Sequence, residues 1–89
     1  MKTEIYTKRL CPFCHRAKAL LDAKQIAYEE IEISADAALQ QQMQERSGRR
    51  TVPQIFIGDI HIGGSDELAL AESNGSLDQL IQRQLKAKT

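Results

Sequence analysis

Segments with the two-residue periodicity of a strand alternate along this chain with segments that have the periodicity of a helix, about 3.6 residues. The first half of the chain reads strand, helix, strand, helix, and the second half reads strand, strand, helix, helix. Strands joined through a helix make right-handed crossovers and pair in parallel, whereas strands joined by a short turn pair antiparallel. The sequence therefore predicts an α/β fold with a partly parallel central sheet, closed by an antiparallel hairpin.

Residues typical of helix ends mark the boundaries of these elements. Pro12 suits a first helical turn, Ser34 or Asp36 can cap the next helix, and Ser47-Gly48 can end it. The expected elements, in chain order, are a strand at 3–7, a helix from 12 to near Lys24 or Gln25, a strand at 28–33, a helix at 37–47, strands at 54–57 and 60–62, a helix capped by Ser65 or Asp66 and running to Ser73, and a helix from Ser76. The tail from Lys86 to Thr89 is expected to fray.

The chain is short and evenly charged. Its 89 residues fit one domain spanning residues 1–89. Lys and Arg number 12, as do Asp and Glu, whereas a nucleic-acid binder normally carries a basic excess, so no nucleic-acid partner is expected. No apolar run approaches the roughly 18 residues that cross a bilayer, and no apolar leader follows Met1. We therefore expect a cytoplasmic protein without a membrane partner.

The two cysteines, Cys11 and Cys14, flank Pro12 and lie too close together for their bridge to act mainly as a staple. With Pro12 at the first helical position, Cys11 becomes the N-cap and Cys14 falls in the first turn. The Cys11 sulfur is then expected to accept the free amides of Phe13 and Cys14 at the positive end of the helix dipole, which favours thiolate. We predict that Cys11 is the nucleophile and that Cys14, protonated at rest, is the resolving thiol.

Basic residues surround this pair in the sequence, and no acidic residue lies between positions 7 and 21: the cations are Lys8, Arg9, Arg16 and Lys18. Nearby cations lower the pKa of a thiol further. A zinc site is the alternative interpretation of such a cysteine pair. It needs two more ligands, for which the chain offers only His15 and His61, so no resident metal is expected.

Three motifs occur in order and together resemble those of the dithiol glutaredoxins, in particular the small bacterial type: Cys11-Pro12-Phe13-Cys14-His15, Thr51-Val52-Pro53 and Gly63-Gly64-Ser65-Asp66. The likeness covers nearly the whole chain and implies a thioredoxin-like fold, a four-stranded mixed sheet flanked by helices. It also implies a monomeric enzyme that reduces glutathione mixed disulfides and protein disulfides, with glutathione as co-substrate and no bound cofactor. Two positions depart from the family, which usually has Tyr at Phe13 and often Cys at Ser65.

The resemblance further implies where glutathione binds. Val52-Pro53 would form a cis peptide bond facing Cys11, and the exposed main chain of Val52 would pair with the extended tripeptide. The amides of Gly64, Ser65 and Asp66 would take the γ-glutamyl carboxylate, with the Asp66 side chain facing the amine. The implied contacts are Lys8, Phe13, Gln40, Thr51, Val52, Pro53, Gly64, Ser65 and Asp66, with Arg50 as a further candidate beside Lys8 and Gln40 for the glycyl carboxylate.

Two other functions remain open on the sequence. One is a cluster-binding module, in which two chains each give Cys11 to an iron–sulfur cluster and two glutathiones supply the other thiolates. Pro12 argues against it by analogy, because glutaredoxin relatives that bind clusters best tend to have Gly there. The other is a thioredoxin-like carrier reduced by a flavoprotein, although the Trp-Cys-Gly-Pro-Cys pattern of thioredoxins is missing.

Overall fold

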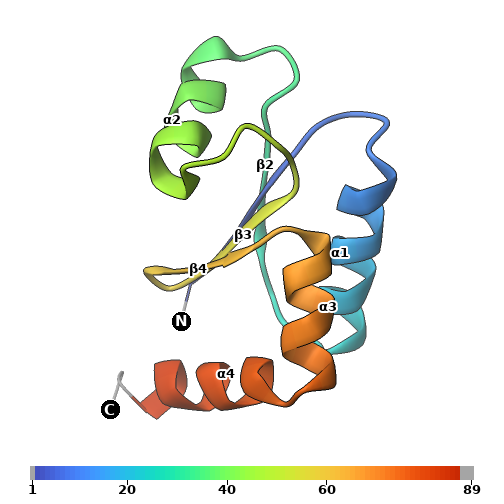
Figure 1. Ribbon diagram of the computed structural model, residues 1–89, viewed down its shortest axis with the longest axis vertical. Coiled ribbons are helices and arrows are strands. Elements are labelled where there is room, and N and C mark those ends of the chain that lie inside the picture. The colour runs from blue at the N-terminus through green and yellow to red at the C-terminus, as the bar shows by residue number, and fades with distance from the viewer. Residues whose placement is uncertain (1, 87–89) are drawn as a thin grey trace.

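The strands and helices follow one another in the predicted order in the computed structural model, which describes residues 2–86 (Figure 1). They are β1 (Thr3–Thr7), α1 (Pro12–Ala23), β2 (Glu29–Glu32), α2 (Ala37–Ser47), β3 (Gln54–Ile57), β4 (Ile60–Gly63), α3 (Ser65–Ser73) and α4 (Ser76–Lys86). The expected fraying concerns a tail of which residues 87–89 lie outside the described part of the chain. None of the described helices is long and apolar enough to cross a membrane.

The four strands form one mixed sheet in the order β2-β1-β3-β4. The neighbours β1 and β2 are parallel because α1 carries the chain back between them, while β1–β3 and β3–β4 are antiparallel. The register places Ile5 opposite Ile55 and Glu4 opposite Phe56. The predicted α/β fold with a four-stranded mixed sheet is confirmed.

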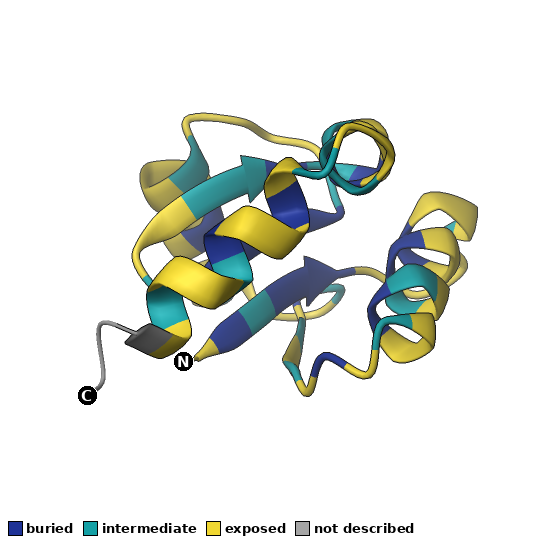
Figure 2. Ribbon diagram, turned by 90° about the horizontal axis from the view of Figure 1, so that it is seen from below, coloured by how far each residue is buried: buried dark blue, intermediate teal, exposed yellow. Residues whose placement is uncertain are grey.

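Each face of the sheet has its own core, because successive side chains of a strand point to opposite faces. Ile5 and Ile55 pack with α1, α3 and α4, whereas Tyr6 and Phe56 pack against Met43 of α2. Figure 1 shows α2 on one side of the sheet and α1 and α3 on the other, and in Figure 2 the exposed residues of the helices lie on their outer sides. The ends of β1 and β3 are thereby held between two packed layers, next to the start of α1.

The helix ends follow local rules, with one correction. Asp36 caps α2 by accepting the Leu39 amide at 3.0 Å, one of the two predicted alternatives. The expected caps of α3, Ser65 or Asp66, are wrong: the N-cap is Gly64. The Glu67 carboxylate accepts the Gly64 amide at 2.7 Å, and this bond from the first turn fixes the helix start one residue earlier.

Candidate active site

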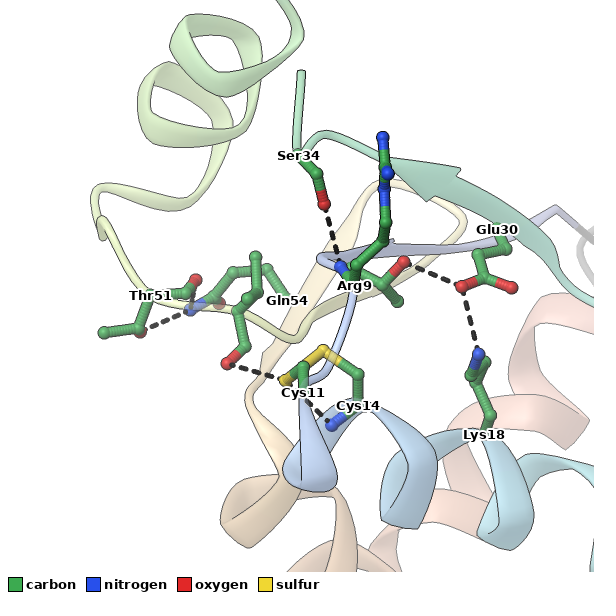
Figure 3. Close-up of a disulfide and its surroundings, with 10 residues drawn as sticks. Arg9, Cys11, Cys14, Lys18, Glu30, Ser34, Thr51 and Gln54 are labelled. Atoms are coloured by element: carbon green, nitrogen blue, oxygen red, sulfur yellow. Dashed lines mark hydrogen bonds and ion pairs between the residues drawn. A yellow bond between two sulfur atoms is a disulfide. The ribbon is translucent and has the colours of Figure 1, made fainter. Parts of the chain in front are cut away.

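Cys11 and Cys14 lie at the start of α1, where the loop from β1 enters the helix, and they are joined by a disulfide (Figure 3). Cys11 is the N-cap, with the extended backbone that an N-cap requires, and Pro12 is the first helical residue, both as predicted. The Cys11 sulfur accepts a hydrogen bond from the Cys14 amide at 3.2 Å, and this is one of the two amides expected to face it. Cys14 is only 2% exposed while Cys11 is half-buried, so an incoming thiolate reaches Cys11 first.

Carboxylates of β2 pair with two of the cations that flank the cysteines in sequence. Arg9 lies 3.1 Å from Glu32, and Lys18 lies 3.1 Å from Glu30. The pKa of Glu30 is lowered, first by the hydrogen bond from the Thr7 hydroxyl and then by Lys18. The charge next to the cysteine pair is therefore less positive than the sequence around it predicts, because the parallel pairing of β1 with β2 brings these acids alongside.

A pocket of about 210 Å³ opens beside Cys11, between the first turn of α1, the loop that precedes β3 and the start of α3. The Val52-Pro53 peptide bond on its wall is cis, as the resemblance implied. The Val52 carbonyl oxygen lies 4.0 Å from the Cys11 sulfur, which carries no hydrogen in the disulfide state, so this is a contact rather than a hydrogen bond. The side chains and main chain that line the pocket belong to Phe13, Arg49, Thr51, Val52, Pro53, Gly64, Ser65, Asp66 and Glu67.

Most of the residues implied to contact glutathione gather around this pocket, but three lie elsewhere. Lys8 lines a second hollow on the Cys14 side of the disulfide. Gln40 is half-buried on α2, where its side-chain amide donates to the Ile33 carbonyl at 2.9 Å. Arg50 is exposed in the loop after α2. The pocket thus brings together the residues expected at the cysteinyl and γ-glutamyl portions, while the three expected at the glycyl end lie outside its wall.

Two residues of the pocket wall, Arg49 and Glu67, are absent from the sequence-based set. Their side chains form an ion pair of 2.6 Å across the wall, from the loop after α2 to the first turn of α3. The hydrogen bond from the Gly64 amide, followed by Arg49, lowers the pKa of Glu67. Because Glu67 already occupies the Gly64 amide, the donors left at this helix start are the amides of Ser65 and Asp66. The three-residue spacing of Gly64 and Glu67, which is that of an N-cap and its third helical residue, could have indicated this role of Glu67 from the sequence.

A buried glutamine on β3 holds the pocket loop through hydrogen bonds to Thr51. Gln54 is 0% exposed, and its side-chain nitrogen donates to the Thr51 carbonyl at 3.1 Å and to the Thr51 hydroxyl at 3.2 Å (Figure 3). Its side-chain oxygen lies 2.7 Å from Nε2 of His61, which must therefore carry a proton and donate. The His61 ring stacks on Phe56, with centroids 4.8 Å apart. Partial burial, and next Arg49, lower the pKa of His61, so the neutral ring is favoured.

Metal ligands do not gather at this site. Between residues 2 and 86, no group of three or more His, Cys, Asp or Glu side chains is placed to hold a metal ion. His15 is exposed on α1, and His61 is engaged with Gln54 on β4. The donor set that the zinc interpretation needs is therefore not assembled around Cys11 and Cys14 in the described region.

Comparisons with known proteins agree with this geometry. The family described as Glutaredoxin matches residues 3–62. Glutaredoxin 3 of Escherichia coli K12 is 53% identical over 79 residues, which cover 89% of this chain and 95% of that protein. The solution structure of glutaredoxin from Brucella melitensis is 52% identical with a TM-score of 0.80, covering 90% of this chain and 87% of that one. The crystal structure of a buckwheat glutaredoxin–glutathione complex is 32% identical with a TM-score of 0.82, covering 91% of this chain and 76% of that one. The chain belongs to the glutaredoxin family.

Proposed function

We propose that this protein is a glutathione-dependent thiol–disulfide oxidoreductase. The observation that carries the proposal is the placement of the Cys11 sulfur, which accepts an amide at the N-terminus of α1 and lies 4.0 Å from the Val52 carbonyl oxygen, in the loop that lines the pocket. A helix N-terminus favours thiolate, and the pocket can hold a short extended peptide against that sulfur. The buckwheat relative, of similar fold, was solved with glutathione.

In the first half of the cycle, the reduced protein carries a Cys11 thiolate. Its sulfur attacks the glutathionyl sulfur of a mixed disulfide, the bond between glutathione and the substrate breaks, and the substrate leaves as a thiolate that takes a proton from water. The product is a Cys11–glutathione disulfide in the pocket. The Cys14 amide lowers the free energy of the thiolate by donating to it, as it donates to the same sulfur in the disulfide state at 3.2 Å.

In the second half, a second glutathione thiolate attacks the sulfur of the bound glutathione. Oxidised glutathione leaves, and the Cys11 thiolate is regenerated. With a protein disulfide as substrate, Cys11 attacks first and forms a mixed disulfide with one protein sulfur. Cys14 then loses its proton and attacks Cys11, which releases the second protein thiol and closes the internal disulfide. Two glutathiones reduce that disulfide in two exchanges.

We propose the binding roles that the family resemblance implies, and the lining of the pocket supports those at the cysteinyl and γ-glutamyl portions. The main chain of Val52 pairs with the cysteinyl portion of glutathione, beside Thr51, Pro53 and the ring of Phe13. The amides of Ser65 and Asp66 take the γ-glutamyl carboxylate, and the Asp66 side chain faces the amine; the Gly64 main chain lies close behind them. Lys8, Gln40 and Arg50 are proposed for the glycyl carboxylate. The cycle uses one chain and consumes reduced glutathione, so we propose a monomer that works in the reducing cytoplasm.

The test is NADPH consumption coupled through glutathione reductase, with a glutathione mixed disulfide as substrate. Wild type and Cys14→Ser should turn over, and Cys11→Ser should not. If wild type is inactive although its internal disulfide titrates, the proposal is wrong and a thioredoxin-like carrier with another reductant is the better description. Colour in anaerobically purified protein would point to the cluster-binding alternative.

A further inference from the structure

Leu10, immediately before Cys11 in the chain, carries an apolar side chain with almost no protein contact. It is 97% exposed, and its backbone φ is 54°, in the left-handed region. On the other side of Cys11 the ring of Phe13 is 52% exposed. Phe13 lines the pocket and Leu10 lines the hollow on the Cys14 side of the disulfide, so this pair flanks the active site.

Neither backbone conformation nor packing accounts for a leucine at this position. Left-handed φ values favour Gly, and Asn tolerates them, whereas a branched apolar side chain does not help to adopt them. The other described non-glycine residue with positive φ is Gln25, with φ 58°. That residue is explained by the end of α1, where the Gln25 amide bonds to Asp22 and the Ile26 amide to Leu21, the pattern of a Schellman motif. Leu10 has no such role, and its side chain is not buried either.

The surface around Leu10 is hollowed, and its positive charge comes from two cations that form no ion pair among the described residues. Leu10 lines the second hollow, of about 500 Å³, together with Cys14 and His15. Glu30 and Glu32 on its far wall are paired with Lys18 and Arg9. Among the ion pairs of residues 2–86, none involves Lys8, on this hollow, or Arg16, which lies over the Phe13 ring at 5.3 Å. An apolar side chain with acidic neighbours would therefore complement this surface.

We propose that Leu10, together with Phe13, is a docking contact for protein disulfides in which an apolar residue adjoins the reacting cysteine. The inference rests on the proposed function, and it adds a substrate preference to it. Leu10 lies on the Cys14 side of the disulfide and does not line the pocket proposed for the cysteinyl and γ-glutamyl portions of glutathione. Lys8, proposed above for the glycyl carboxylate, lines the same hollow as Leu10 and is free for an acidic residue when a protein disulfide takes the place of glutathione. The occupant is an extended segment of the substrate protein that is joined to Cys11 in the mixed disulfide, with its apolar neighbour on Leu10 and its acidic residues near Lys8 and Arg16.

The reaction used for the test contains no glutathione. The Cys11 thiolate attacks one sulfur of a peptide disulfide, and the other peptide sulfur leaves and takes a proton. The Cys14 thiol then gives up its proton and attacks Cys11, and the first peptide sulfur leaves as a thiol. Two electrons pass from the protein dithiol to the peptide, which ends with two thiols.

The experiment mixes fully reduced protein with either of two synthetic peptides that carry an intramolecular disulfide and acidic flanks, one with Leu and one with Asn next to the more exposed cysteine. The second-order rate of protein oxidation is followed by acid quench and mass spectrometry. Wild type should prefer the Leu peptide by about fivefold, the effect of partly burying one leucine. Leu10→Asn, which suits the left-handed backbone, should lose that preference, whereas Leu10→Met should keep it. Leu85→Asn, at an exposed leucine of α4, should behave as wild type.

The ratio of the oxidation rates with the two peptides is independent of any change in the reactivity of Cys11, because such a change affects both rates equally. The proposal is overturned if Leu10→Asn prefers the Leu peptide as strongly as wild type does. It is also overturned if Leu10→Asn reacts more slowly than wild type by the same factor with both peptides, because Leu10 would then act only on the thiolate. The proposed function is tested separately by wild-type turnover of a small glutathione mixed disulfide. Its failure would leave the peptide ratio intact, so the two results are distinguishable.

Discussion

Replacing Gln54 with leucine should lower the free energy of unfolding by about 2 kcal/mol. The fully buried side chain makes three hydrogen bonds, two to Thr51 and one to His61. Each contributes about 1 kcal/mol net. Thr51 is exposed, so its carbonyl and hydroxyl regain water in the variant, and leucine fills most of the space of glutamine. These two effects reduce the sum of about 3 kcal/mol to about 2 kcal/mol.

The assay is urea unfolding at neutral pH in dithiothreitol, so that both proteins are compared as dithiols. For a domain of this size the expected loss corresponds to a fall of roughly 8–16 °C in Tm. His61→Phe is the matched control, because it keeps a ring on Phe56 and removes only the donor to Gln54. It should lower the free energy of unfolding by about 1 kcal/mol, and the double variant should show less than the sum, since the two residues share one bond.

The same variant tests whether Gln54 positions the pocket loop. Thr51 lines the pocket beside Cys11, so the loss of its two bonds to Gln54 should raise KM for a glutathione mixed disulfide more than it lowers kcat. A stability loss under about 0.5 kcal/mol would refute the hydrogen-bond reasoning. A full stability loss with unchanged KM would show that Gln54 holds the fold and does not set the loop.

Three further outcomes are expected. Glu67→Gln should make stability less sensitive to acid. The Gly64 amide and Arg49 lower the folded-state pKa of Glu67, so wild type gains stability above the ordinary pKa of 4.5 and loses it as pH falls through the lower folded-state pKa. Urea unfolding of both proteins at neutral pH and near pH 3 measures this, and equal losses would contradict it. Gln25→Gly should raise the free energy of unfolding by about 0.5–1 kcal/mol, because the left-handed φ of 58° is unfavourable for glutamine, and an unchanged urea midpoint would count against this. Cys14→Ser should keep deglutathionylation and lose reduction of protein disulfides that need a resolving thiol; equal retention of both activities in coupled assays would show that Cys14 is dispensable.

The features that the sequence predicts well are those that depend on residues close together in the chain. The alternation of strand and helix patterns specified the mixed sheet, and Pro12 specified that Cys11 caps α1. What it missed depends on contacts between distant segments. Glu30 and Glu32 lie beside Lys18 and Arg9 only because β2 pairs with β1, and Arg49 reaches Glu67 only because the loop after α2 meets the start of α3. Gln54, in a strand of apolar residues, gave no sign that both ends of its amide would be bonded.

The asymmetry between the two cysteines also sets the direction of exchange. The pocket lies on the Val52 side of Cys11, and Cys14 is 2% exposed and turned toward the opposite hollow. Thiol–disulfide exchange proceeds through attack along the line of the breaking bond, so a thiol in the pocket meets Cys11 with Cys14 as the leaving group. Attack on Cys14 would instead have to come through the hollow that Lys8, Leu10 and His15 line. Leu10 is 97% exposed and so covers little of Cys14, which burial in the first turn of α1 protects. Leu10→Gly should therefore leave trapped glutathione adducts at Cys11, which peptide mapping would detect. A rise in adducts at Cys14 in that variant would show that the Leu10 side chain, and not burial within the helix, protects Cys14.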